Sequence, residues 1–194
     1  MQPSIDLTKP TPDYVQQRVR EFDADEKLKR DERAVALVFQ QWPANSDHEQ
    51  VLVKTVVLNR LYSTNIYAVQ TVANHIVGLR IDERLHRGDT SLIDDIASVQ
   101  IKGEDHFFLS FATKYCSWHQ PEHFQMFDSN VESMLWRYER EFKFGSFRKD
   151  ELRKYPRFVQ IIDLFRSHFG LPDIGRKEVD KFLWIEGRKK PVTA

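Results

Sequence analysis

The sequence is poor in the residues that cross-link or interrupt a chain. Cys116 is the only cysteine among 194 residues, which excludes an internal disulfide and a four-cysteine iron–sulfur cluster and fits a reducing compartment. Seven glycines and eight prolines leave no low-complexity linker. No apolar run approaches the roughly 20 residues that span a bilayer, and residues 1–9 lack the apolar core of an export signal. We therefore expect a cytoplasmic globular protein with one domain or two small lobes.

An overall charge of one sign is also lacking, because 29 Lys and Arg balance 29 Asp and Glu. The balance shifts along the chain, and residues 137–194 hold 15 basic against 9 acidic side chains. A local excess matters for phosphate binding, since charge is screened beyond about 8–10 Å in physiological salt. The C-terminal excess is typical either of a solvated helical face or of a phosphate-binding surface, and the sequence leaves both open.

Apolar side chains recur at helical spacing nearly everywhere, and strand-like alternation is absent. Thr11-Pro12 predicts the start of a helical stretch that runs to Gln41 with a break near residues 23–25. Ser46-x-x-Glu49 fits a capping box, followed by an apolar stripe of Val53, Val57 and Leu61. Further helices are expected over residues 66–79, near 89–96, over 107–116, from 128, around 158–169 and around 179–183. The predicted fold class is all-α.

The segment from Pro121 to Val131 places Asp128 at the start of an amphipathic helix. One interpretation is that the aspartate only caps the helix, where its carboxylate accepts a backbone N–H. The other is that the helix N-terminus keeps this carboxylate charged, so that it stabilises positive charge on a deoxyribose or orients a water molecule. Ser129-x-x-Glu132 offers a second capping box, so the helix does not strictly need Asp128.

The order of an apolar helix, the pattern Pro-x-x-Phe-x-x-x-Asp-x-x-Val and an amphipathic helix resembles the catalytic region of the helix-hairpin-helix (HhH-GPD) DNA glycosylase superfamily. Residues 52–64 are similar to that family's helix and polar turn near its DNA wedge. Residues 108–111 lie where the helix after the hairpin would begin. The resemblance implies a two-lobed helical bundle in which residues 50–140 form the glycosylase-like lobe. The N-terminal segment 1–49 would then pack with the basic helices of 141–194.

Three departures from the family's pattern shape the expected chemistry. The family hairpin usually reads Leu-Pro-Gly-x-Gly, whereas residues 99–103 retain one glycine. The longer spacing to Asp128 implies an insertion near residues 115–121. Aligning on Gly103 puts an acidic residue where bifunctional members carry a Schiff-base lysine, and both Lys102 and Lys114 are out of register. The resemblance therefore implies a monofunctional, cofactor-free enzyme that leaves an abasic site.

The resemblance also implies which residues form the site. Asp128 would be catalytic and would act on double-stranded DNA bound by a monomer. Aromatic candidates for stacking against the base are Tyr62, Phe107, Phe111, Tyr115 and Trp118, of which we expect two at most to touch it. Candidates for DNA contacts are Arg60, Ser63, Thr64, Asn65, Lys102, Gly103, Ser129 and Asn130. The base is not specified by the sequence: it could be damaged or mismatched, as in repair, or hypermodified in foreign (phage) DNA, as in antiviral defence.

Two other functions compete with this prediction. Cys116-x-x-His119-x-x-x-His123 has the residue types of a zinc site, but Pro121 prevents one helix from presenting all three, and we expect no metal. A non-catalytic all-helical module that binds DNA or protein is the alternative to the enzyme. A cleft of ligand size beside Asp128 would favour the enzyme, whereas an aspartate facing only solvent and backbone would favour the module.

Overall fold

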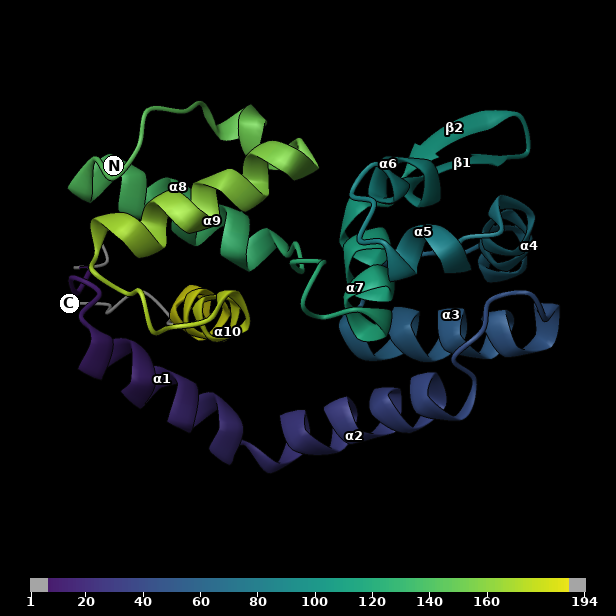
Figure 1. Cartoon of the computed structure of the whole chain (residues 1–194), viewed down its shortest axis with the longest axis horizontal. Coiled ribbons are helices and arrows are strands. Elements are labelled where there is room, and N and C mark those ends of the chain that lie inside the picture. Colours follow the sequence, from purple (N-terminus) through teal and green to yellow (C-terminus); the bar gives the residue numbers. More distant parts are fainter. Residues whose placement is uncertain (1–6, 189–194) are drawn as a thin grey trace. The chain divides into compact units, whose positions relative to one another are not determined.

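A computed structural model describes residues 7–188 of the chain (Figure 1). Within that range the chain is mainly helical, which confirms the predicted class in outline. The α-helices are α1 (Pro12–Ala24), α2 (Glu26–Gln41), α3 (His48–Tyr62), α4 (Val69–Leu79), α5 (Asp82–His86), α6 (Leu92–Ala97), α7 (Leu109–His119), α8 (Ser129–Phe142), α9 (Tyr155–His168) and α10 (Arg176–Gly187). A 3-10 helix, η1 (Lys149–Arg153), and two strands, β1 (Ser98–Ile101) and β2 (Glu104–Phe107), complete the described elements.

Two expectations concern membranes and export. Among the described helices, none combines the length and apolarity that crossing a bilayer requires. Residues 1–6, which carry part of the expectation about an export signal, lie outside the described range.

The chain divides into two compact units. The central unit is residues 26–127 and holds α2 to α7 with both strands. The terminal unit consists, in its described part, of residues 7–25 and 128–188 and holds α1, α8, η1, α9 and α10. These boundaries differ from positions 50 and 140 suggested by the resemblance, because α2 packs on α3 and α7 whereas α8 packs on α10.

The core of the central unit is built around α3 and α7. The buried residues of α3 are Val51, Lys54, Thr55 and Leu58, whereas Val53 is 38% exposed. The predicted stripe of Val53, Val57 and Leu61 was therefore wrong, since the helix turns a face that includes a lysine and a threonine inward. In α7, every residue from 111 to 117 is buried, so this helix is enclosed on most sides.

A β-hairpin follows α6 in the central unit, and Figure 1 shows it as a two-stranded ribbon beside that helix. Ile101 pairs with Glu104, which leaves Lys102 and Gly103 as a two-residue turn with φ of 53° and 84°. Positive φ at both central residues is what a type I′ turn requires. The prediction that strands are absent was wrong here, and the segment compared with the family's helical hairpin forms a β-hairpin.

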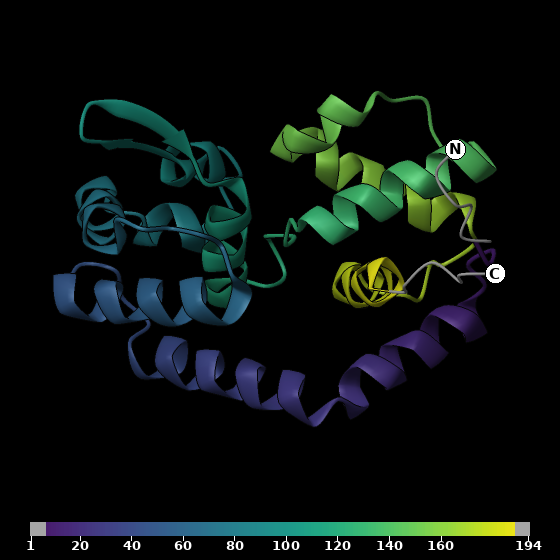
Figure 2. The ribbon, with the colours of Figure 1, turned by 180° about the vertical axis from the view of Figure 1, so that it is seen from behind.

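The terminal unit has a core rich in aromatic rings. Tyr138 of α8 is buried and contacts the rings of Phe165, Phe169 and Phe182, with centroid distances of 5.4–6.1 Å. Each of α8, α9 and α10 buries an apolar stripe that includes Val131, Phe158 and Val179, respectively. In both Figure 1 and Figure 2, α1 lies alongside α10. A buried carboxylate joins these two helices, because Glu186 accepts a hydrogen bond from the Tyr14 hydroxyl at 2.9 Å.

Candidate functional site

The backbone immediately before Asp128 is held by α7. The Phe127 N–H donates to Thr113 Oγ1 at 3.0 Å, and the Phe127 carbonyl accepts from Lys114 Nζ at 2.8 Å. Lys114 is only 2% exposed; it also donates to Ser110 Oγ at 2.7 Å and lies 5.6 Å from the centre of the Tyr62 ring. Both backbone polar atoms of Phe127 are thus satisfied by buried side chains, which fixes the end of the central unit.

Asp128 is the N-cap of α8 in the terminal unit. Its Oδ1 accepts from the Asn130 N–H at 2.8 Å, and the half-buried residue has the extended backbone of an N-cap. The alternative capping box at Ser129 does not form, because the Glu132 carboxylate binds the Arg153 guanidinium through two hydrogen bonds of 2.9 and 3.2 Å. Asp128 is therefore the N-cap of α8, so its carboxylate has a structural role independent of any catalytic one.

The first turn of α8 is packed closely against the end of α10. A Cβ added to Gly187 would lie 2.9 Å from Asn130 Cβ and 3.3 Å from Met134 Cγ. Only a residue without a side chain fits this approach without displacing α8. The first turn that carries Asp128 thus has a fixed position within the terminal unit.

The five aromatic candidates occupy different environments. Phe111 and Tyr115 have no exposed surface and belong to the core of the central unit. Tyr62 and Trp118 are half-buried and joined by a hydrogen bond of 3.1 Å from the indole N–H to the phenol oxygen. Phe107 is 53% exposed, on β2. Surface for a planar base is thus offered by Phe107 and in part by Tyr62 and Trp118.

The eight positions suggested for DNA contacts fall into three groups. Ser129 and Asn130 lie in the first turn of α8, and Lys102 with Gly103 forms the exposed hairpin turn. The other four, Arg60, Ser63, Thr64 and Asn65, come together where α3 ends. There Ser63 and Asn65 adopt positive φ, and Thr64 Oγ1 donates to the Asn59 side chain at 2.9 Å.

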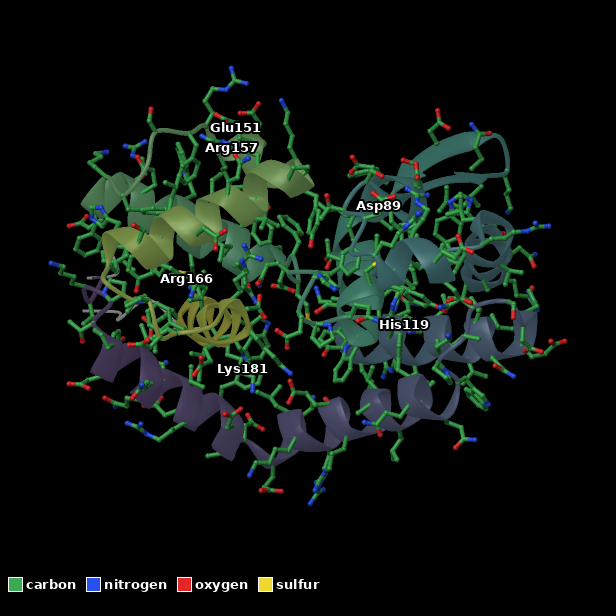
Figure 3. The ribbon with its side chains drawn as sticks, viewed as in Figure 1. Asp89, His119, Glu151, Arg157, Arg166 and Lys181 are labelled. Atoms are coloured by element: carbon green, nitrogen blue, oxygen red, sulfur yellow. The ribbon has the colours of Figure 1, made fainter. Side chains whose placement is uncertain are left out.

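The basic stretch of residues 148–157 is largely neutralised within the terminal unit. Each of its three arginines pairs with a carboxylate: Arg148 with Asp150, Arg153 with Glu132, and Arg157 with Glu151. Figure 3 labels the last of these pairs. A backbone hydrogen bond from Arg148 and then the Arg157 guanidinium lower the pKa of Glu151. Of the two interpretations of the C-terminal charge, this pairing favours the solvated face.

A buried polar cluster in the central unit was not anticipated from the sequence. Lys54 has no exposed surface, and its Nζ donates to the carbonyls of Trp42 and Ala44 at 3.1 and 2.8 Å and to Asn45 Oδ1 at 2.6 Å. His119 Nε2, at the end of α7 (Figure 3), is 3.5 Å away. Burial lowers the pKa of the Lys54 ammonium to about 8, and the charge of Asp82 opposes part of this shift. The lysine holds the loop between α2 and α3.

Asn45 connects this lysine to two other helices. Its side-chain amide donates to Asp82 Oδ1 at 2.7 Å, and its Oδ1 also accepts from the Tyr115 hydroxyl at 2.6 Å. His119 packs against the rings of Phe39 and Tyr115. Burial, and next the charge of Lys54, lowers the pKa of His119 to about 3, so the imidazole is neutral at pH 7. The buried members of the cluster, Lys54, Asn45 and Tyr115, are all hydrogen-bonded, as expected of a group that joins helices.

The zinc-like residue types do not assemble. Cys116 is buried, where burial raises the pKa of its thiol; His119 is part of the cluster just described, and His123 is exposed. Among residues 7–188, no three His, Cys, Asp or Glu side chains come together in a way that could hold a metal ion.

Comparison with known proteins links the chain to one family. Residues 14–123 match the family described as HI_0787_N, N-terminal domain. A protein of Haemophilus influenzae (strain ATCC 51907 / DSM 11121 / KW20 / Rd), described as uncharacterized, is 39% identical over 142 residues, which cover 73% of this chain and 68% of the relative. No solved structure matches. The family match takes in most of α1 and nearly all of the central unit, and ends before Asp128.

Proposed function

This chain belongs to the HI_0787_N N-terminal domain family, and we propose that it hydrolyses the N-glycosidic bond between a damaged or modified base and deoxyribose in DNA. The observation that carries the proposal is the placement of Asp128. A short apolar segment leaves α7, and the next helix begins with an aspartate whose position is fixed by capping. This is the order of elements around the catalytic aspartate that the glycosylase resemblance implies.

Preorganisation around the aspartate supports the proposal. Within the terminal unit, the Asp128 carboxylate accepts the Asn130 N–H of the first turn of α8, and Asn130 packs closely against Gly187. A charge that stabilises a transition state acts best when it does not have to reorganise during the reaction. The cap and this packing thus limit the movement of the carboxylate within the terminal unit.

The chemistry would proceed with Asp128 as the anion. As the bond to the base breaks, positive charge develops on the deoxyribose ring, and the Asp128 carboxylate would stabilise it and orient the attacking water toward C1′. The base leaves with a proton from the water, the sugar gains the hydroxyl of that water at C1′, and an abasic site remains. The target base must first leave the stack, at a cost of a few kcal/mol.

The substitution Asp128→Asn tests this role. Asparagine is also a good N-cap, so the free energy of unfolding should change by less than about 1 kcal/mol. Base release should fall by at least ~100-fold, because a charge matched to the transition state is lost. The assay incubates the protein with DNA carrying deaminated, alkylated, oxidised, mispaired or hypermodified bases. Alkali then reveals abasic sites, and strand cuts should appear only after the alkali step.

Asp47→Asn is the matched control. Asp47 is likewise an N-cap, that of α3, and its Oδ1 accepts from the N–H of the third helical residue, Gln50, at 2.9 Å, whereas Asp128 accepts from the second. The Asp47→Asn substitution should change the free energy of unfolding as little as Asp128→Asn does, and it should leave base release at the native rate. Full activity of Asp128→Asn, on a substrate that the native chain processes, would reduce the aspartate to a cap and overturn the proposal.

A specific observation favours a second function, a non-catalytic helical module that binds DNA or protein. The Asp128 carboxylate has a structural role as the cap of α8, and a β-hairpin stands where a helical hairpin was expected. Under this alternative the native chain would release no base from any DNA of the panel.

A further inference from the structure

A partly exposed aromatic cluster lies on the central unit. It consists of Tyr67, His106 and Phe108, which we call the aromatic platform. Tyr67 is 65% exposed, and its hydroxyl is 3.1 Å from His106 Nε2. The His106 and Phe108 rings are stacked with centroids 5.7 Å apart and an angle of 3° between their planes. Tyr67 is exposed and the other two rings are half-buried, so together they offer aromatic surface on which a flat ligand can stack.

The platform is held by its supporting segments. Ile66, the residue before Tyr67, is 4% exposed, and Asn59 binds both its N–H and its carbonyl at 2.9 and 2.8 Å. His106 belongs to β2 and pairs with the buried Val99 of β1. A rigid aromatic surface binds a flat ligand with little loss of conformational entropy.

The charge of the central unit argues against duplex DNA as what the platform binds. Residues 26–127 contain 11 Lys and Arg against 13 Asp and Glu. Two of these cations, Lys54 and Lys114, are buried, and Arg84 is engaged with Asp89 and Asp95. Duplex binding depends on the neutralisation of several phosphates by Lys and Arg, so the charge of this surface contributes little to binding a duplex. One of the remaining cations, Lys102, lies in the hairpin turn, and the two residues directly after that turn, Glu104 and Asp105, are acidic.

Unpaired bases suit such a surface better. Stacking of bases on aromatic side chains is tolerant of sequence and contributes about 1–3 kcal/mol per base, and each phosphate contact contributes less to the salt dependence of single-strand binding than to that of duplex binding. We propose that the aromatic platform stacks an unpaired base, and that the substrate class of the proposed glycosylase is single-stranded DNA. The proposal rests on the proposed function for its choice of DNA, and it replaces the double-stranded substrate that the resemblance implies.

Equilibrium binding of the full chain tests the platform without any catalysis. The probes are a fluorescein-labelled oligodeoxythymidine of about 15 nucleotides and a duplex of equal length, compared by fluorescence anisotropy. The single strand should bind at least ~10-fold more tightly than the duplex. Tyr67→Ala should weaken single-strand binding by about 10-fold, the loss of one base stack, and should leave duplex binding unchanged. Tyr67→Phe keeps the ring and should bind as the native chain does.

The matched control is Leu37→Ala, which removes another side chain of the central unit that is 68% exposed. It should bind the single strand as the native chain does. Duplex binding equal to or tighter than single-strand binding, an undiminished affinity of Tyr67→Ala, or no binding to the single strand would each overturn the proposal. Failure of the proposed function is seen separately, as an absence of base release or an Asp128→Asn variant with the native rate.

Discussion

Replacing Lys54 by methionine tests whether a buried cation holds the central unit together. Methionine has a similar length and fits an apolar site, but it donates no hydrogen bond. The carbonyls of Trp42 and Ala44 and the Oδ1 of Asn45 would lose the donor that Lys54 Nζ gives them. Each buried acceptor left unsatisfied costs about 1–3 kcal/mol, and removing the penalty of a buried charge offsets part of this. We expect Lys54→Met to lower the free energy of unfolding by about 3 kcal/mol at pH 7.

The same change has a pH dependence whose sign is set by the pKa of Lys54. Burial lowers this pKa from 10.5 to about 8 in the folded protein. Between these pH values the unfolded chain binds more protons at this site than the folded chain does, so the native protein gains stability as the pH rises. Where the two states differ by one bound proton, the free energy of unfolding changes by about 1.4 kcal/mol per pH unit. Lys54→Met lacks this group, so its deficit relative to the native chain should widen on the alkaline side.

Urea unfolding of both chains at neutral pH and at about pH 9.5 measures this difference. The deficit of Lys54→Met should be larger at the alkaline pH by about 2 kcal/mol. Other tyrosines and lysines titrate in both chains and cancel in the comparison, with the exception of neighbours such as Tyr115 that touch the cluster. A deficit that stays constant or shrinks as the pH rises would show that Lys54 is not a desolvated cation, and would refute the reasoning.

Two further predictions concern the central unit. Because the pKa of His119 is lowered from 6.5 to about 3, the unfolded chain binds more protons below pH 6.5 and acid destabilises the native protein. The stability that the native chain loses between neutral pH and about pH 5 should therefore exceed the loss of His119→Gln by up to about 2 kcal/mol in urea unfolding; equal losses would contradict it. Gly103→Ala puts a side chain at φ 84° and should lower the free energy of unfolding by about 1 kcal/mol, whereas Lys102→Asn, with φ 53°, should raise it by about 0.5 kcal/mol; thermal unfolding that ranks them the other way would exclude a type I′ turn.

Helical periodicity predicted the positions of the main helices, but it chose the wrong face of α3. The buried face of α3 consists of residues 51, 54, 55 and 58. Because two of these, Lys54 and Thr55, are polar, this face does not stand out in the sequence as an apolar stripe. The valines at positions 53 and 57 follow the helical apolar spacing more regularly, yet Val53 is exposed and Val57 is half-buried. The lysine is accommodated because its three acceptors come from residues 42–45, a loop whose position depends on the tertiary fold. A sequence pattern cannot register a partner of this kind.

The β-hairpin was missed for a different reason. Its strands are four residues long, and β1 alternates strictly, with Ser98 and Gln100 exposed and Val99 and Ile101 buried. Four residues are too few for alternation to stand out beside the neighbouring helical pattern. The turn also lacks the Asn-Gly pair that marks a type I′ hairpin most clearly, and places Lys102 at the first position of positive φ.

Asp128 shows how capping and catalysis can require the same residue. The sequence offered Ser129 and Glu132 as a spare cap, which would have left Asp128 free for chemistry. Glu132 is instead committed to Arg153, and Asp128 caps α8 through Oδ1. Capping and charge nevertheless make different demands, because a cap needs an oxygen that accepts a hydrogen bond and the proposed chemistry needs an anion. Asparagine meets the first demand and fails the second. A comparison of Asp128→Asn with Asp47→Asn therefore separates two roles that the geometry of a single carboxylate combines.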